Sequence, residues 1–198
     1  MIETLHYSAL VAPNRLKDAY VDLRYGRKLA GYRDLKHLGL PDVTGIAPTP
    51  THVLEDVFAL EPIKPDDVLC DVGCGDGRVI AWWLSQGLQN RIIGLELDPS
   101  TALSTSCRFE RYSNVRILHC DATHMLPVAT VFYLYNPFFG DMMRRFAAQI
   151  MRQPHAKVIY YHHTALEAFE DGRFNVELKK PRNDRQQGVA IIRPRRSP

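Results

Sequence analysis

Residues 68–79 of this 198-residue chain read VLCDVGCGDGRV. The first five, Val68 to Val72, form a short apolar run that predicts a buried strand. Three glycines follow it at alternate positions: Gly73, Gly75 and Gly77. Because glycine has no Cβ, such a turn lets a ligand approach the backbone closely. A helix is expected from Arg78 to Leu84, so the stretch predicts a strand, a ligand-binding turn and a helix.

Helix-like and strand-like segments alternate from about Thr49 onward. Apolar runs predict further strands at 92–97, 115–119, 131–135, 158–161, 174–178 and 189–192. Helical patterns and start signals predict helices at 51–60, from Asp98-Pro99 to about Arg111, at 141–151 and briefly up to Ala168. Strands separated by helices indicate βαβ units and a doubly wound, mostly parallel sheet. A polar loop between the last two strands suits a hairpin, which adds one antiparallel strand.

The N-terminal quarter has a different pattern. Residues 14–30 look helical and Gly31 is a stop signal, after which glycines and prolines recur up to Pro50. We read this part as an appendage packed on one domain. The predicted division is an N-terminal helical appendage at 1–48, a domain at 49–193 and a flexible basic tail at 194–198.

Composition sets the broad class. With 45% hydrophobic and 24% charged residues the chain is typical of a globular protein, which excludes disorder, collagen and coiled coil for most of it. The net charge of +3 is too small to indicate nucleic acid by itself. Neither a secretory signal nor a membrane span is expected. Four cysteines without a C-x-x-C pair predict reduced thiols in a cytoplasmic protein, and no metal site is expected.

The glycine spacing separates kinds of nucleotide site. The dinucleotide fingerprint G-x-G-x-x-G needs a third glycine where this chain has Arg78, which disfavours an NAD(P)-dependent oxidoreductase but leaves it as an alternative. A P-loop sequence is absent. Asp71 lies just before the glycines and Asp76 lies within the loop, and carboxylates there repel a pyrophosphate but suit an ammonium group. The loop therefore favours a cationic nucleoside that carries an amino acid.

Asp71, Gly73, Gly75 and Gly77 match, position by position, the motif D-x-G-x-G-x-G. In this the sequence resembles the class I S-adenosylmethionine-dependent methyltransferases, from about Thr49 to Arg193. The resemblance implies a Rossmann-like sheet of seven strands and direct methyl transfer without a metal. It also implies a set of cofactor-binding residues: Asp71, Gly73, Cys74, Gly75, Asp76 and Gly77 for the amino-acid part, Glu96 for the ribose, Asp121 for the adenine amino group, and Leu97 and Ala122 for the adenine ring.

Asn136-Pro137-Phe138-Phe139 follows the predicted strand 131–135. It resembles the N-P-P-[YF] tetrad of amino-group methyltransferases, with Phe138 in place of the second proline, and a similar string occurs in small bacterial members without an assigned substrate. The resemblance implies that Asn136 and Pro137 are catalytic, since the Asn136 side chain (which would also border the cofactor) and a backbone carbonyl accept hydrogen bonds from the target nitrogen. Phe138 and Phe139 would bind the substrate. Alternatively, Asn136 only ends the strand and Pro137 turns the chain.

The methyl acceptor stays open between a protein lysine, a small molecule and a nucleobase. The G-x-G-D-G-R loop is similar to that of lysine methyltransferases that act on membrane ATP-synthase subunits. Basic residues near the last two strands would attract an acidic substrate or nucleic acid, or form a solvated hairpin tip: Lys179, Lys180, Arg182 and Arg185. A non-catalytic S-adenosylmethionine-binding subunit is a further alternative.

A lid is the other hypothesis for the N-terminal segment. Residues 14–50 would close the cofactor crevice and line the acceptor pocket with Tyr20, Arg24, Tyr25 and Arg27, of which Tyr25 is the predicted substrate-binding residue. The alternative is a brace that only covers apolar surface.

Overall fold

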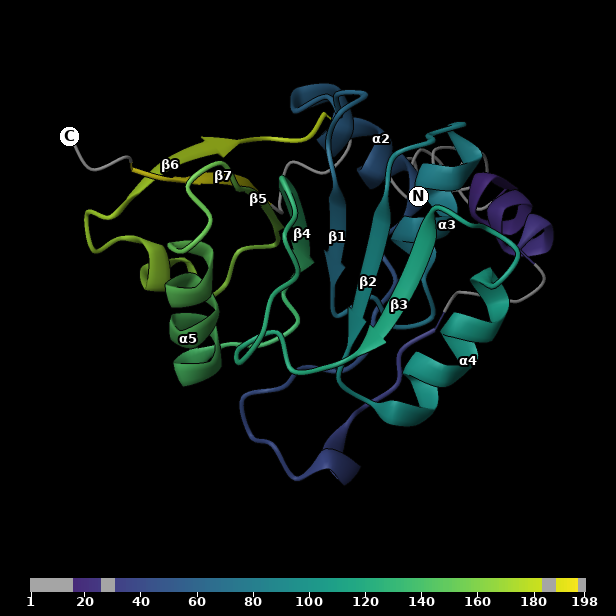
Figure 1. Ribbon diagram of the computed structural model, residues 1–198, viewed down its shortest axis with the longest axis horizontal. Helices are drawn as coiled ribbons and strands as arrows, with labels where there is room; N and C mark the ends of the chain where they lie inside the picture. The colour runs from purple at the N-terminus through teal and green to yellow at the C-terminus, as the bar shows by residue number, and fades with distance from the viewer. Residues whose placement is uncertain (1–15, 26–30, 183–187, 196–198) are drawn as a thin grey trace, which may run out of the picture.

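The computed structural model describes residues 16–25, 31–182 and 188–195. Seven strands form one open sheet in the order β3-β2-β1-β4-β5-β7-β6 (Figure 1). The strands are β1 (Leu69–Val72), β2 (Ile92–Glu96), β3 (Val115–His119), β4 (Val131–Tyr135), β5 (Lys157–Tyr161), β6 (Phe174–Lys179) and β7 (Val189–Pro194). Strands β1 to β5 pair in parallel, and β7 is antiparallel to both of its neighbours. The predicted doubly wound, mostly parallel fold with a closing hairpin is confirmed.

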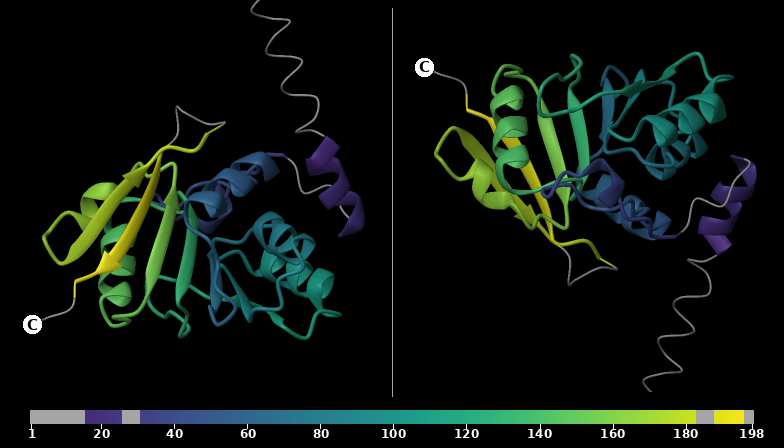
Figure 2. Two further views of the ribbon diagram at one scale, coloured as in Figure 1. Left: turned by 90° about the horizontal axis from the view of Figure 1, so that it is seen from above. Right: turned by 90° about the horizontal axis from the view of Figure 1, so that it is seen from below.

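Helices cover both faces of the sheet (Figure 2). They are α2 (Thr51–Leu60), α3 (Arg78–Ser85), α4 (Pro99–Phe109), α5 (Gly140–Ile150) and the 3-10 helix η2 (Leu166–Phe169). One face packs on α5 and η2, where Phe146 lies edge-on to Phe132 of β4. The other packs on α2 and α3, where Phe58 stacks on Trp82 with 5.2 Å between ring centroids. Two apolar layers thus hold the carboxyl ends of β1, β2 and β4 at one edge.

Two helix starts near that edge follow from local sequence. Asp98 is the N-cap of α4, its carboxylate accepts a hydrogen bond from the Thr101 amide, and Pro99 takes the first helical position, as predicted. Helix α3 begins directly after Gly77, which has a left-handed φ of 85° and lies against the ring of Phe109. A side chain at Gly77 would collide with that ring, so this glycine serves packing between α3 and α4.

Residues 31–50, which we call the strap, cross beneath the carboxyl ends of the strands, at the bottom of Figure 1. Arg33 and Ile46 exchange two backbone hydrogen bonds of 3.1 and 2.8 Å, which folds the strap back on itself around the 3-10 helix η1 (Lys36–Leu38). Val43 forms an antiparallel bridge with Phe138, just beyond β4. The strap is therefore attached to the sheet edge by main-chain contacts.

The helix and strand boundaries near the two ends of the described chain agree only in part with the predictions. Helix is present at 16–24, whereas residues 14–15 and 26–30 lie outside the described residues. The prediction of a flexible tail from residue 194 onward is wrong for its first two residues. Pro194 ends β7, and the Arg195 amide donates a hydrogen bond to the Arg173 carbonyl at 2.8 Å. The division at 48/49 stays a prediction.

The basic segment after β6 emerges at the carboxyl edge, as expected for a strand parallel to β5. Its Arg185 lies outside the described residues. Within the described ranges, no helix is both long and apolar enough to cross a membrane.

Candidate active site

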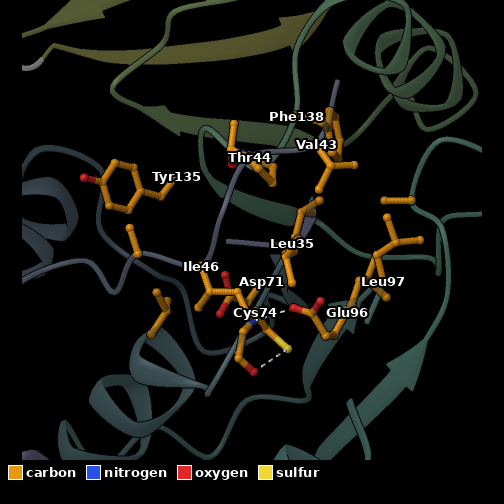
Figure 3. A pocket seen from close by; sticks show the side chains of 18 of the residues that line it. Leu35, Val43, Thr44, Ile46, Asp71, Cys74, Glu96, Leu97, Tyr135 and Phe138 are labelled. Atoms are coloured by element: carbon orange, nitrogen blue, oxygen red, sulfur yellow. Dashed lines mark hydrogen bonds between the residues drawn. The ribbon is translucent and has the colours of Figure 1, made fainter. Parts of the chain in front are cut away.

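A cavity, which we call the inner cavity, lies between the strap and the carboxyl ends of β1, β2 and β4 (Figure 3). Side chains from the strap, such as Leu35 and Ile46, line it opposite those that follow the strands. Most of the predicted cofactor residues line it as well: Asp71, Gly73, Cys74, Gly75, Asp76, Glu96, Leu97, Asp121 and Ala122. Gly77 does not, because it packs on Phe109, so its assignment to the cofactor is corrected.

The glycine turn brings two distant segments close to β1. Gly73 and Gly75 have left-handed φ values of 73° and 51°. A Cβ on Gly73 would come within 2.8 Å of the Pro137 Cβ, and one on Gly75 within 2.7 Å of Ile46 Cγ2. The missing side chains therefore let the segment after β4 and the strap lie directly on the turn.

Asp71 carries the most unusual electrostatics of the site. Its side chain is buried, and its Oδ2 has no hydrogen-bond partner within the described part of the chain. Burial, with a smaller contribution from the charge of Glu96, raises the pKa of Asp71 to about 8. An unpartnered buried carboxyl oxygen bordering a cavity fits a cationic ligand group. The ammonium group of S-adenosylmethionine is such a group, so this residue fits the cofactor that the resemblance implies.

Glu96 is held firmly at the end of β2. Its two carboxylate oxygens accept hydrogen bonds from the Gly75 and Asp98 amides, at 2.8 and 2.9 Å. Burial raises the pKa of Glu96, although these amides act in the opposite direction. Because a carboxylate oxygen can accept more than one hydrogen bond, both oxygens can still accept hydrogen bonds from ribose hydroxyls. The nearby carboxylate of Asp98 caps helix α4 and lies 2.9 Å from His37.

Asp121 follows β3 and is oriented by its own turn. Its Oδ1 accepts from the Thr123 amide at 2.8 Å, and its Oδ2 lies 2.9 Å from His124 Nδ1. Burial alone would raise its pKa, but the bonds from Thr123 and His124 outweigh burial and lower it. The carboxylate therefore stays ionised at neutral pH, as an acceptor for an adenine amino group requires.

Asp76 is ion-paired with residues of the strap and of α4. Its carboxylate lies 2.8 Å from Arg33 of the strap and 4.0 Å from Arg108 of α4. These cations already balance its charge. Asp76 borders the inner cavity and also anchors the strap, and its contact with a cofactor stays a prediction.

The oxygen atoms of the segment after β4 accept hydrogen bonds from other residues of the protein. Asn136 Oδ1 accepts hydrogen bonds from the Tyr160 hydroxyl at 2.9 Å and the Thr164 hydroxyl at 2.6 Å. The Asn136 carbonyl accepts from Thr44 Oγ1 at 2.6 Å, and the Pro137 carbonyl from the Thr44 amide at 3.1 Å. Asn136 has a left-handed φ of 47°, which asparagine tolerates better than most residues. This segment is thus tied both to β5 and to the strap.

A second cavity of about 670 Å³, the outer cavity, lies on the other side of the strap. Tyr135, Asn136 and His162 line it from the sheet edge, and the strap supplies Tyr32, Asp34, Leu35, Lys36, Gly39, Leu40, Pro41, Val43, Thr44, Gly45 and Ala47. Thr44 and Tyr135 line both cavities, so the two adjoin. Asn136 borders only the outer one, which separates it from the predicted cofactor contacts.

Three predicted substrate residues have different fates. Phe138 is buried, lines the inner cavity and packs on Phe146 with 5.6 Å between ring centroids. Phe139 is 41% exposed at the start of α5 and lines neither cavity. Tyr25 is buried between Phe109 and Tyr112, with centroids 6.1 and 5.9 Å away, so its placement in the acceptor pocket is wrong.

The other residues expected of a lid also lie away from the cavities. Tyr20 and Arg24 belong to helix 16–24 and line neither cavity, and Arg27 lies outside the described residues. The residues that do cover the site are apolar or small members of the strap, such as Leu35 and Ile46, which carry no motif. The only signal for them was Pro48-Thr49-Pro50, which turns the chain back toward the crevice.

Comparison with known proteins agrees with this geometry. A family model described as a methyltransferase domain matches residues 70–133. A curated histone-lysine N-methyltransferase of Dictyostelium discoideum is 28% identical over an alignment of 167 positions that covers 72% of this chain. The chain spans only 9% of the length of that relative.

Solved structures share the fold. A mutant of MtNAS in complex with S-adenosylmethionine has a TM-score of 0.57 at 16% identity, over 73% of this chain and 62% of that one. An RNA methyltransferase from Salinibacter ruber in complex with S-adenosyl-L-homocysteine has a TM-score of 0.54 at 22% identity, over 77% and 97%. Human N-acetylserotonin methyltransferase has a TM-score of 0.60 at 13% identity, over 71% and 51%.

The family model covers the strand–glycine turn–helix unit together with the ends of β2 and β3, which are the elements that build the inner cavity. Residues 70–133 thus carry a methyltransferase domain, and the chain has the fold of S-adenosylmethionine-dependent methyltransferases.

Proposed function

We propose that this protein transfers a methyl group from S-adenosylmethionine in the inner cavity to a nitrogen atom of an acceptor bound in the outer cavity. The observation that carries the proposal is the pair of main-chain oxygens held by Thr44 at the junction of the cavities: the Asn136 carbonyl and the Pro137 carbonyl. A nitrogen nucleophile gains positive charge as the methyl group arrives, and carbonyl oxygens stabilise that charge.

The chain's own residues would hold the cofactor by three polar contacts. Asp71 would bind the ammonium group, Glu96 the ribose hydroxyls and Asp121 the adenine amino group. S-adenosylmethionine supplies an activated methyl group, so the protein is left with binding, orientation and the exclusion of water.

Alignment of the acceptor falls to the main chain in this proposal. A carbonyl oxygen has two lone pairs, and the Pro137 carbonyl has one partner among the described residues, the Thr44 amide. One lone pair is therefore left for an N–H of the target. Asn136 Oδ1 already has two hydroxyl donors, so the side-chain role implied by the tetrad would require displacing one of them. We assign the orienting oxygen to Pro137.

The strap would act as the lid. It lines both cavities, lies on Gly75 through Ile46, and pairs with Asp76 and Asp98 through Arg33 and His37. Covering the donor and the nucleophile excludes water from the transfer. Helix 16–24 is ion-paired with Arg78 of α3, and Tyr25, directly after the helix, packs on Phe109 of α4, which supports a brace as its role.

Cofactor binding is tested by calorimetry with S-adenosyl-L-homocysteine and NAD. The wild-type protein should bind the former and not the latter. Glu96→Ala should weaken binding by about 1–3 kcal/mol, the range for charge-assisted hydrogen bonds, whereas the exposed control Glu170→Ala should bind as the wild type does. Tight NAD binding, or unchanged affinity in Glu96→Ala, contradicts the assignment.

The acceptor is sought with labelled S-adenosylmethionine and a fractionated lysate. Label in proteins, nucleic acids or small molecules identifies the class, and chemical analysis of the product identifies the methylated atom. Methylation at oxygen or carbon would overturn the nitrogen proposal. Cofactor binding without transfer to any fraction would favour the non-catalytic subunit.

A further inference from the structure

The side-chain amide of Asn136 has a defined orientation. The Tyr160 hydroxyl accepts a hydrogen bond from the Ala165 amide at 3.2 Å, and it has one proton to donate, which goes to Asn136 at 2.9 Å. The atom that receives it must be the amide oxygen. Tyr160 is buried, and burial raises the pKa of its phenol, so the phenol keeps this proton at all ordinary pH values.

The Thr164 hydroxyl completes the oxygen's partners. It lies 2.6 Å from the same Oδ1 and takes up the second lone pair. The NH₂ end of the amide, by contrast, makes no hydrogen bond to any described residue. Because Asn136 lines the outer cavity, the group it offers to a ligand there is a donor.

We infer that the acceptor molecule carries a carbonyl or carboxylate oxygen beside the nitrogen that is methylated, and that this oxygen accepts a hydrogen bond from the Asn136 side-chain NH₂. The inference rests on the proposed function, since it names the substrate class of the same site. Lys36 and His162 add N–H donors to the cavity lining, whereas Asp34 is its acid.

A simple alkylamine does not meet this requirement. A neutral lysine side chain has a single lone pair, which must point at the methyl group during transfer, so no acceptor is left for the Asn136 NH₂. A protonated one has donors only. The Asn136 NH₂ would then be desolvated without a partner, and leaving a polar group unpaired in a site discriminates strongly against such a substrate.

Asn136→Asp separates the donor role from the acceptor role. Aspartate has nearly the same shape, tolerates the left-handed backbone as asparagine does, and keeps an oxygen for Tyr160 and Thr164. It replaces the NH₂ donor with a negatively charged oxygen that can only accept hydrogen bonds. With the lysate fraction that takes up label as substrate, kcat/KM should fall about 100-fold, the lower range for loss of one active-site donor. S-adenosyl-L-homocysteine should bind within twofold of wild type.

Asn175→Asp is the matched control, because Asn175 lies exposed on the edge strand β6, and it should keep wild-type kcat/KM. Wild-type kcat/KM in Asn136→Asp would overturn the inference. Label on the side-chain nitrogen of a protein lysine would do the same.

A binding measurement keeps the inference testable without turnover. In the protein saturated with S-adenosyl-L-homocysteine, the side-chain NH₂ resonances of Asn136 are assigned by their loss in Asn136→Asp. An amino-acid mixture should shift them, and the matched decarboxylated amines should not. Equal shifts with both probe sets, or with neither, would overturn the inference. Absence of methyl transfer together with the expected shifts would refute the proposed function alone.

Discussion

At the scale of single residues, Asp71 shows how the site departs from a structure optimised for stability alone. It lies in β1 between buried neighbours, and one of its carboxyl oxygens has no hydrogen-bond partner among the described residues. Burying a carboxyl group in this way disfavours its charged form, and Glu96 adds to the effect. Strongly shifted groups beside a cavity are typical of functional sites.

The stability of the ligand-free protein should therefore depend on the protonation of Asp71. Its pKa of about 8 in the folded protein is higher than the ordinary value of 3.8, so the folded state binds more protons than the unfolded state between these values. The contribution of Asp71 to the free energy of unfolding is therefore fully present below about pH 4. It is lost as the pH rises through about 8. Urea denaturation at a series of pH values measures this.

Asp71→Asn provides the comparison for that series. The amide cannot ionise, so the decline in the free energy of unfolding from about pH 4 to pH 8 should be smaller than in the wild type. The variant should also bind S-adenosyl-L-homocysteine more weakly, because an ammonium group loses a carboxylate partner. Identical pH dependence in both proteins would refute the predicted protonation of Asp71.

At the scale of elements, the strap and the glycine turn form one closing device. Ile46 contacts the turn where Gly75 lacks a side chain, and the backbone pairing of Ile46 with Arg33 places the Arg33 guanidinium 2.8 Å from Asp76. Thr44 joins the same strap to the segment after β4. A ligand in the inner cavity would be enclosed by contacts from both sides, and the strap must shift to release it.

Ile46→Ala should speed the release of S-adenosyl-L-homocysteine. The substitution removes apolar contact between strap and turn, while Arg33, His37 and Thr44 still hold the strap in place. We expect the dissociation rate to rise about tenfold, which is equivalent to about 1.4 kcal/mol. Stopped-flow fluorescence measures the rate, and Val128→Ala, at a residue 85% exposed, should leave it unchanged. An unaltered rate in Ile46→Ala would show that the strap does not gate release.

At the scale of the whole molecule, the N-terminal helix 16–24 is joined to the core by one buried guanidinium. Arg78 is 3% exposed and lies 2.7 Å from Asp18 and 2.9 Å from Asp22. Asp18 also accepts hydrogen bonds from Thr51 at the start of α2. The residue that replaces the third glycine of a dinucleotide fingerprint thus fastens the helix to α2 and α3.

Arg78→Met should destabilise the fold by about 1.5–3 kcal/mol, because it removes a buried cation that is ion-paired with two partly buried carboxylates. Urea denaturation at neutral pH gives the free energy of unfolding. The same substitution combined with Asp22→Asn should lose less stability than the two single changes added together, since they remove one shared interaction. Strict additivity would show that the Arg78–Asp22 pair contributes little.

The sequence by itself was enough for the features that depend on neighbours along the chain. The strand, glycine turn and helix at 68–85 follow from a local pattern, and Asp98-Pro99 caps a helix through its own next residues. The parallel sheet follows from the alternation of strands and helices. It places Glu96 and Asp121 at the carboxyl edge, since parallel strands end on the same side.

Only the tertiary structure decided which groups meet across long separations. Thr44 binds Asn136 across 92 residues, Arg33 reaches Asp76 across 43, and Thr164 reaches Asn136 across 28. These contacts determine which residues cover the cavities, how the charge of Asp76 is balanced and how the Asn136 side-chain amide is oriented. Tyr25 was misplaced for the same reason, because the apolar surface of α4 that buries it exists only after folding. Hydrogen-bond orientation and burial are properties of assembled surfaces, which no local pattern in a sequence contains.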